Sequence, residues 1–193
     1  MSLFRQSRKG LTFRTKKKII TPELIRDILS CVFFCGVAVF FAFALVTAFG
    51  MRIRAVGDSM SPTVSSGERV LVDSLIYKLS RPSRGDIVVF RPGGNEKTHY
   101  YIKRVAAVPG DTVQIVDGVL MVNGLPSSAI TSIFGDPGIA ALPVTLETGT
   151  YFVVGDNPDS GEDSRSANIG PVELSHIYGK AWFKLGDNSG FLR

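Results

Sequence analysis

The chain is poor in cysteine and histidine, and both shortages narrow the chemistry open to it. Only two cysteines, Cys31 and Cys35, and two histidines, His99 and His176, occur among its 193 residues. Both cysteines fall within one apolar run, so residues 52–193 can form no internal disulfide and must fold by burying a hydrophobic core. So few thiol and imidazole ligands cannot assemble a typical zinc site. We therefore expect no bound metal.

Charge is absent from the 24 residues between Asp27 and Arg52. A helix of that length would extend about 36 Å, enough to cross the roughly 30 Å hydrocarbon core of a membrane. The run lacks the polar stripe of a soluble amphipathic helix, and it exceeds the about 7–15 apolar residues of a cleaved signal peptide. We therefore expect a transmembrane helix over residues 28–51.

The two flanks of this run differ in charge. Residues 1–27 carry a net charge of +6, whereas residues 52–193 carry −1. Because basic residues favour the cytoplasmic side, we expect a single-pass protein of the cell (inner) membrane, with residues 1–27 as a cytoplasmic tail and residues 52–193 exported to the periplasmic or extracytoplasmic side. A basic arm for nucleic acid or anionic lipid is the alternative for residues 1–18, but topology alone explains the charge. No nucleic-acid partner is expected.

Beyond the apolar run, sustained helical periodicity is missing, and short runs of β-branched and aromatic residues alternate with turn residues. This pattern predicts a mainly β fold, an irregular sandwich or barrel of several small sheets. Asp117-Gly118 predicts a two-residue hairpin turn, and residues 74–79 suit one short helical turn. Residues 125–149 contain three prolines and suggest a long connection or small insertion rather than core. The expected strands cover residues 68–73, 85–90, 99–108, 111–116, 119–124, 150–156 and 177–185.

The segment GDSMSPT (57–63) places Ser59 in a turn shortly after the apolar run. Its hydroxyl would be accessible there, although a plain turn serine is the simplest interpretation of the segment alone. A nucleophilic serine needs a base, either a histidine or a lysine that is neutral at the working pH. His99 and His176 are the histidine candidates, and both are more simply explained as surface residues.

Lys103 is the lysine that best suits a neutral base, because it lies in the middle of the predicted strand 99–108. Strand alternation puts it on the same face as Tyr101 and Val105. Burial would lower the pKa of its amine, and the charge of Arg104 would lower it further. A lysine that reaches solvent from an edge strand is the plainer alternative.

Four segments follow the apolar run in a fixed order: GDSMSPT, YYIKRVAAVPGD, VVGDNPDSGEDSR and IYGKAWF. Together they resemble the type I signal peptidases, which are membrane-bound serine proteases with a Ser–Lys dyad, over about residues 56–183. The resemblance implies a β-fold endopeptidase that removes signal peptides from exported preproteins, with small residues at positions −1 and −3 of the substrate. It also implies that Ser59 is the nucleophile and Lys103 the general base of an acyl-enzyme mechanism.

The resemblance implies supporting roles as well. The backbone of Ser59, and that of Gly57, would form the oxyanion hole. Family members usually carry a lysine-orienting serine where this chain has Gly161, so Ser160 or Ser164 would have to take over that role. Asp163 and Arg165 would form an ion pair, and Asp156 and Asn157 would shape a turn. The full set of supporting residues is Met60, Pro62, Arg104, Asp156, Asn157, Ser160, Ser164, Asp163 and Arg165.

Other functions stay open at this point. A specialised relative that matures one dedicated substrate, such as a conjugative pilin, would share every motif. A catalytically inactive tethered binding module is a second alternative, although the presence of both Ser59 and Lys103 argues against it. The fold of self-cleaving repressors is disfavoured because the apolar run stands in place of a DNA-binding domain. The expected partners are preproteins, membrane lipid and the secretion translocon, with no cofactor.

Overall fold

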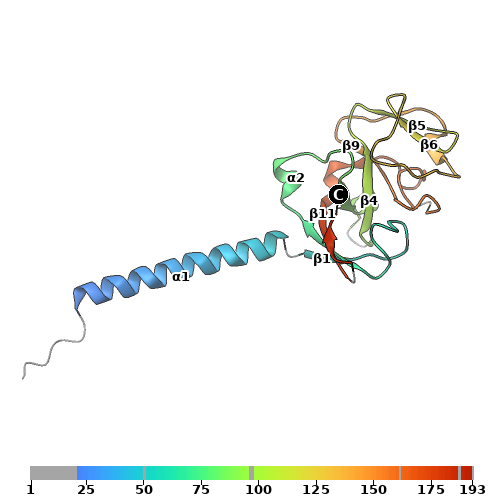
Figure 1. The fold of residues 1–193 in the computed structure, drawn as a ribbon. Coiled ribbons are helices and arrows are strands. Elements are labelled where there is room, and N and C mark those ends of the chain that lie inside the picture. Colours follow the sequence, from blue (N-terminus) through green and yellow to red (C-terminus); the bar gives the residue numbers. More distant parts are fainter. Residues whose placement is uncertain (1–20, 50, 96–97, 161, 187, 193) are drawn as a thin grey trace, which may run out of the picture. The chain divides into compact units, whose positions relative to one another are not determined.

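The computed structural model contains one long helix and a β-rich domain (Figure 1). Its contacts divide the chain into two units, residues 1–42 and residues 43–193. The residues that the structure describes are 21–49, 51–95, 98–160, 162–186 and 188–192.

Helix α1 (Pro22–Phe49) is apolar along nearly its whole length. It starts with Pro22, which suits the first helical position because its missing N–H would have no partner there. The hydroxyl of Thr21 caps this end by accepting a hydrogen bond from the Leu24 N–H at 3.3 Å. The segment Pro22–Val46 is long and apolar enough to cross a membrane. Met51, predicted as the last residue of the helix, begins strand β1 instead.

The larger of two sheets holds eight strands in the order β1-β2-β11-β3-β4-β9-β10, with β12 paired to β11. All neighbouring strands are antiparallel. The last long strand of the chain, β11, therefore lies between two early strands. The strands are β1 (Met51–Arg54), β2 (Arg69–Asp73), β3 (Ile87–Phe90), β4 (Tyr101–Ala107), β9 (Thr150–Val154), β10 (Val172–Glu173), β11 (Ile177–Leu185) and β12 (Gly190–Phe191).

The smaller sheet has the order β7-β6-β5-β8. Asp117 and Gly118 turn the chain between β5 and β6 with positive φ angles of 51° and 79°. Two positive φ angles are what a type I′ hairpin turn requires, so the predicted hairpin is confirmed. The strands are β5 (Thr112–Val116), β6 (Val119–Val122), β7 (Leu125–Pro126) and β8 (Val144–Thr145).

All seven predicted strands are present, and the predicted helical turn at residues 74–79 is α2 (Ile76–Leu79). The unpredicted strands β1, β7, β8, β10 and β12 are only two to four residues long. Alternation cannot be recognised over so few residues. Three short 3₁₀ helices complete the domain: η1 (Pro92–Gly94), η2 (Gly138–Ala141) and η3 (Leu174–His176).

Residues 125–149 contribute to the core, contrary to the expectation from their prolines. Four of their side chains, Ile130, Phe134, Ala140 and Leu146, are buried in one cluster with residues of both sheets. Burial of apolar side chains stabilises the fold in proportion to the area removed from water. The segment is therefore a packed part of the domain.

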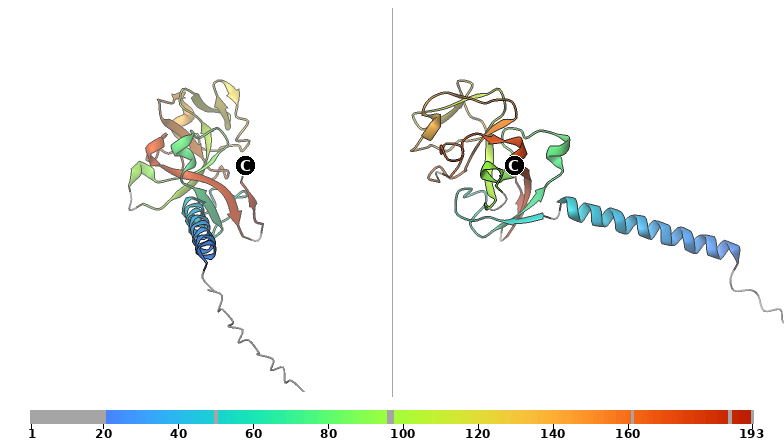
Figure 2. Two further views of the ribbon diagram at one scale, coloured as in Figure 1. Left: turned by 90° about the vertical axis from the view of Figure 1, so that its left-hand side faces the viewer. Right: turned by 180° about the vertical axis from the view of Figure 1, so that it is seen from behind.

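The strands curl and do not form one flat layer, as the two further views show (Figure 2). A second apolar cluster underlies the end of β1 and the turn that follows it, and includes Ile53, Ala55, Met60 and Val64. The predicted mainly β fold is thus confirmed. The segment that carries Ser59 rests directly on this core.

Candidate active site

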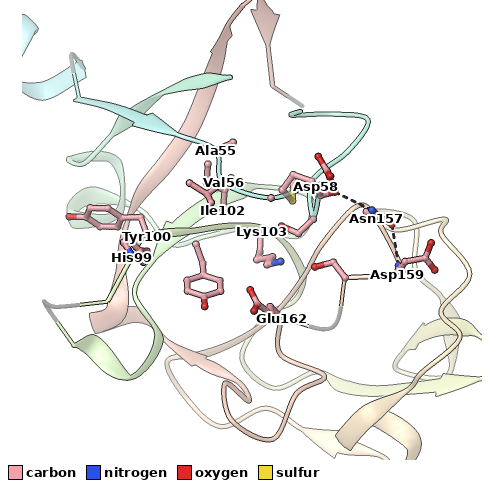
Figure 3. A pocket seen from close by; sticks show the side chains of 15 residues that line it. Ala55, Val56, Asp58, His99, Tyr100, Ile102, Lys103, Asn157, Asp159 and Glu162 are labelled. Atoms are coloured by element: carbon pink, nitrogen blue, oxygen red, sulfur yellow. Dashed lines mark hydrogen bonds between the residues drawn. The ribbon is translucent and has the colours of Figure 1, made fainter. Parts of the chain in front are cut away.

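A cleft of about 400 Å³ opens on the β domain and brings together three segments far apart in the sequence (Figure 3). Its walls are residues 55–60 after β1, residues 99–103 at the start of β4, and residues after β9 that include Asn157, Asp159 and Glu162. Ser59 and Lys103 both line this cleft. The two residues singled out from the sequence therefore share one site.

The turn that carries Ser59 is held in place by core packing and by hydrogen bonds from the chain after β9. The Met60 side chain is 2% exposed and anchors the turn in the core. The Asn157 N–H donates to the Ser59 carbonyl at 3.1 Å, and the Asn157 side-chain amide donates to the Asp58 carbonyl at 3.2 Å. A Cβ at Gly155 would lie 2.4 Å from the Ser59 carbonyl oxygen, so only glycine permits this close approach. The chain after β9 thus fixes the position of Ser59.

Two backbone donors of this turn are available to a ligand. Within the described part of the chain, the N–H groups of Gly57 and Ser59 donate no hydrogen bond to a protein acceptor. The Ser59 side chain is half-buried and faces the cleft. The backbone conformation of Gly57 has a φ of 78°, which glycine adopts readily. This arrangement can bind an oxyanion next to a hydroxyl group.

Lys103 is 1% exposed, and its amine points into the cleft (Figure 3). It makes no hydrogen bond or ion pair with any residue that the structure describes. Burial lowers the pKa of its amine from 10.5 to about 8, and the Arg165 charge lowers it too, while Asp163 and Glu162 oppose the shift. A lysine with such a pKa is partly neutral near neutral pH and can accept a proton.

Arg104, the next residue of β4, is also buried, but its charge is paired. Its guanidinium holds both carboxylate oxygens of Asp156 at 2.7 Å and donates to the Gly85 carbonyl at 2.8 Å. Asp156 also accepts a hydrogen bond from the Thr63 hydroxyl at 2.5 Å. The expected contribution of Arg104 to the low pKa of Lys103 is wrong, because the cation that lowers it is Arg165. Asp156 binds Arg104 across the sheet and does more than shape a turn.

The predicted ion pair between Asp163 and Arg165 is present and buried. Arg165 Nε and Nη2 contact the two carboxylate oxygens of Asp163 at 2.9 Å each. Arg165 also donates to the carbonyls of Pro158 and Ser160, and its guanidinium lies 4.5 Å from the centre of the Phe134 ring. The pair therefore ties the loop after β9 to the smaller sheet.

The two serines proposed to replace the hydroxyl missing at Gly161 differ in their positions. The Ser164 Oγ is buried and accepts a hydrogen bond from the Val153 N–H at 3.0 Å, so it holds strand β9. Ser160 lines the cleft. Of the histidines, His99 lines the cleft and His176 lines a different pocket. Gly161 itself lies outside the described residues.

Three carboxylates on the wall of the cleft were not predicted from the sequence. Asp58, Asp159 and Glu162 all line it, and each is exposed. Figure 3 shows the Glu162 carboxylate and the Lys103 amine pointing into the same space. Exposed acidic residues in loops carry no periodic signal, so only the folded chain reveals that they gather here. Pro62, the remaining supporting residue, follows a cis Ser61–Pro62 peptide bond in the Ser59 turn.

Comparison with known proteins gives this site a family. A family model described as signal peptidase, peptidase S26, matches residues 28–185. Signal peptidase I of Bacillus licheniformis is 36% identical over 140 residues, which cover 66% of this chain and 72% of that protein. Signal peptidase IB of Staphylococcus aureus is 34% identical over 152 residues, which cover 70% of this chain and 77% of that protein.

A solved structure of a signal peptidase I from Enterococcus faecalis V583 is 29% identical, with a TM-score of 0.41, and covers 52% of this chain and 97% of that chain. The family model and the curated relatives establish that the chain belongs to the signal peptidase family, peptidase S26. It is a serine endopeptidase of the signal peptidase I type. The resemblance stated from the four sequence segments is confirmed.

Proposed function

We propose that this chain is a membrane-anchored signal peptidase that removes N-terminal signal peptides from exported preproteins, with Ser59 as nucleophile and Lys103 as general base. One observation carries the proposal: the buried Lys103 amine, which has no hydrogen-bond partner among the described residues, opens into the same cleft as the half-buried Ser59. A buried amine of this kind is costly to stability, and its retention is best explained by a chemical role.

In the proposed reaction, neutral Lys103 accepts the proton of the Ser59 hydroxyl as Ser59 attacks the scissile carbonyl. With a pKa of about 8, roughly one amine in ten is neutral at pH 7. The N–H groups of Ser59 and Gly57 would hold the oxyanion, and Lys103 would pass the proton to the leaving amine. The Lys103 amine, neutral again, would then activate a water molecule that releases the acyl group from Ser59. The Ser59 hydroxyl makes no hydrogen bond to Lys103 among the described contacts, so it turns toward the amine as the substrate binds.

The cleft suits an extended peptide with small side chains. On one side, Tyr101–Arg104 pair with β3, but on the other side β9 begins to pair only at Arg104. The backbone of residues 101–103 is therefore open on the cleft side, where a substrate strand can add to the sheet. The apolar side chains of Ala55 and Ile102 line this space and suit the small residues expected at positions −1 and −3.

Anchoring and topology follow from the first unit. Helix α1 is long and apolar enough to span a membrane. The net charge of +6 before residue 28 supports a cytoplasmic N-terminus and a catalytic domain on the outer side of the cell (inner) membrane. In this arrangement, membrane lipid surrounds α1, and preproteins reach the enzyme as they leave the secretion translocon.

The direct test is cleavage of a labelled preprotein by the purified, detergent-solubilised protein. We expect release of the signal peptide by the wild-type chain and none by Ser59→Ala, and a serine-directed acylating inhibitor should label only the former. Cleavage by Ser59→Ala would refute the assigned nucleophile. A panel of preproteins, with a pilin precursor among them, separates a general enzyme from one dedicated to a single substrate. The test for a dedicated substrate is motivated by Gly161, which stands where family members usually carry serine.

A further inference from the structure

A second pocket, of about 380 Å³, lies where β3 ends and where β4 and β11 begin. Its charged or titratable lining residues are Lys78, Arg91 and His176, and its aromatic ones are Tyr100 and Tyr178. Within the described part of the chain, no carboxylate lines this cationic pocket. An acidic residue beside the pocket is Glu173, whose exposed carboxylate lies 4.0 Å from His176 Nε2 and accepts a hydrogen bond from Ser175.

Arg91 is the central cation of this pocket. Its Nε is buried and has no hydrogen-bond acceptor among the residues that the structure describes. Its guanidinium lies 4.2 Å from the centre of the Tyr100 ring, a cation–π contact that fixes its position. Buried donors in folded proteins almost always have an acceptor. An anion bound in the pocket would supply the one that the chain does not.

The pocket is built on packed elements. The Arg91 N–H donates to the His176 carbonyl at 3.1 Å, which joins the end of β3 to η3. The rings of Tyr100 and Tyr178 meet edge to face at 5.4 Å between centroids. These contacts hold Arg91, Tyr100 and His176 in place before any ligand arrives, and such preorganisation lowers the cost of binding.

Tyr100 connects the cationic pocket to the catalytic cleft, because it lines both. Figure 3 shows Tyr100 and His99 at one end of the cleft, with Asn157 and Asp159 at the other. Tyr100 and Lys103 are three residues apart in extended chain, which corresponds to about 10 Å. A peptide extended along this strand passes from the reactive groups to the pocket within about three of its own residues.

We propose that the cationic pocket binds an acidic side chain of the preprotein, about three residues from the scissile bond. This inference rests on the proposed function and adds a specificity determinant to it. Arg91 would hold the substrate carboxylate in a charge-assisted hydrogen bond, and Lys78 and His176 would add attraction. Substrate, and not lipid, is the favoured source of the anion because Tyr100 lines both the pocket and the cleft in which the peptide must lie.

The experiment uses the full-length protein and a series of peptide substrates. A reference peptide carries no acidic residue, and each member of the series places one Asp, or a matched Asn, at a single position on either side of the scissile bond. For the wild-type protein we expect one position at which Asp raises kcat/KM about tenfold over Asn, mainly through a lower KM. Arg91→Met should cleave the Asp and Asn peptides equally well. Arg69→Met, which removes an exposed cation of β2 outside both pockets, should keep the wild-type preference.

The outcomes separate the two proposals. If wild-type protein cleaves the Asn peptides but prefers Asp at no position, or if Arg91→Met keeps the preference, the inference is overturned and the proposed function stands. If wild-type protein cleaves none of the peptides or preproteins, both fall. The same assay in neutral and in anionic vesicles, and with inorganic phosphate, identifies the source of the anion. Loss of the Asp preference on anionic vesicles alone would assign the pocket to a lipid headgroup and overturn the substrate proposal.

Discussion

Strand β4 buries one basic side chain on each face, and the two differ in whether they have a hydrogen-bonded partner. On the cleft face, the Lys103 amine is buried with no acceptor among the described residues. On the other face, the Arg104 guanidinium binds both oxygens of Asp156 and the Gly85 carbonyl. The two residues are neighbours in sequence and differ little in exposure, so burial alone does not decide what a buried charge does.

The difference lies in the partners and in the chemistry of each cation. A guanidinium stays charged in proteins, and a matched carboxylate lets it remain charged when it is buried. An ammonium can lose its proton, and burial without a partner favours the neutral form. The paired face therefore stabilises the domain, whereas the unpaired face holds an amine that can accept a proton, at the expense of stability.

The largest expected effect is on turnover. Lys103→Arg keeps a cation at the cleft but cannot release its proton, so kcat should fall by about 10³-fold or more while the fold survives. Preprotein cleavage measures the loss, and circular dichroism checks the fold. Lys180→Arg, at a lysine whose amine pairs with Asp86, is the matched control and should remain active. An active Lys103→Arg enzyme would mean that another base acts, and His99 is then the candidate in the cleft.

The next effect tests the paired face. Arg104→Met leaves the buried Asp156 carboxylate without its guanidinium, and we expect a loss of about 3–5 kcal/mol in the free energy of unfolding. Denaturant unfolding of the detergent-solubilised protein gives this value. Arg104→Met combined with Asp156→Leu should recover most of the loss, because the unpaired charge is then gone. A loss below about 1 kcal/mol in the single variant would show that the two faces do not differ as described.

Lys103→Met should stabilise the protein in a pH-dependent way. The pKa of the amine is about 8 in the folded chain and 10.5 when unperturbed. The shift corresponds to a penalty of about 3 kcal/mol, fully present below pH 8 and lost as the pH rises from 8 to 10.5. The stability gained by the variant should therefore be largest below pH 8 and vanish near pH 10.5. A gain that does not change across this range would contradict a buried, titrating amine.

A smaller effect concerns the pH dependence of the reaction. The rising limb of kcat/KM should lie near pH 8, with the rate falling about tenfold for each pH unit below it. Ser160→Ala tests whether the cleft hydroxyl replaces the serine missing at position 161. If Ser160 orients the amine, the variant folds normally and loses most of its rate. If both the rate and the limb are unchanged, another group positions Lys103.

The smallest expected effect concerns the link between the two faces. Asp156 binds Arg104, and the next residue, Asn157, binds the Ser59 turn. Asn157→Ala removes the amide that donates to the Asp58 carbonyl but keeps the backbone bond to Ser59. We expect a loss of about 1 kcal/mol in stability and a decrease of a few fold in kcat. A decrease as large as that of Lys103→Arg would place Asn157 in the chemical step.

Sequence reasoning succeeded where a signal repeats over many residues. Every strand of five or more residues was predicted because apolar and β-branched residues mark it, and the hairpin was predicted because Asp117-Gly118 suits its positive φ angles. The two-residue strands of the smaller sheet, and the buried residues of 125–149, lack such a pattern. Their positions depend on packing against partners distant in sequence.

The site was predictable only in part, for the same physical reason. Ser59 and Lys103 were proposed from the family motifs, and the structure shows that they line one cleft. The partner of Arg104 is 52 residues away, and the contact between Asn157 and Asp58 spans 99 residues. No local pattern encodes such distances, so the sequence suggested that Arg104 would lower the pKa of Lys103, when its charge is in fact paired.

Strand β11 also has a consequence for how the protein is made. It pairs with β2 on one side and with β3 on the other, although β2 ends at Asp73, β3 ends at Phe90 and β11 begins only at Ile177. During synthesis from the N-terminal end, β2 and β3 therefore cannot take their places in the sheet until residues 177–185 have been made. The larger sheet, and with it the cleft, closes only when nearly the whole chain has been made. We therefore expect an incomplete chain to be inactive, and the loss of the last few residues of β11 to cost more stability than the loss of the same number from a loop.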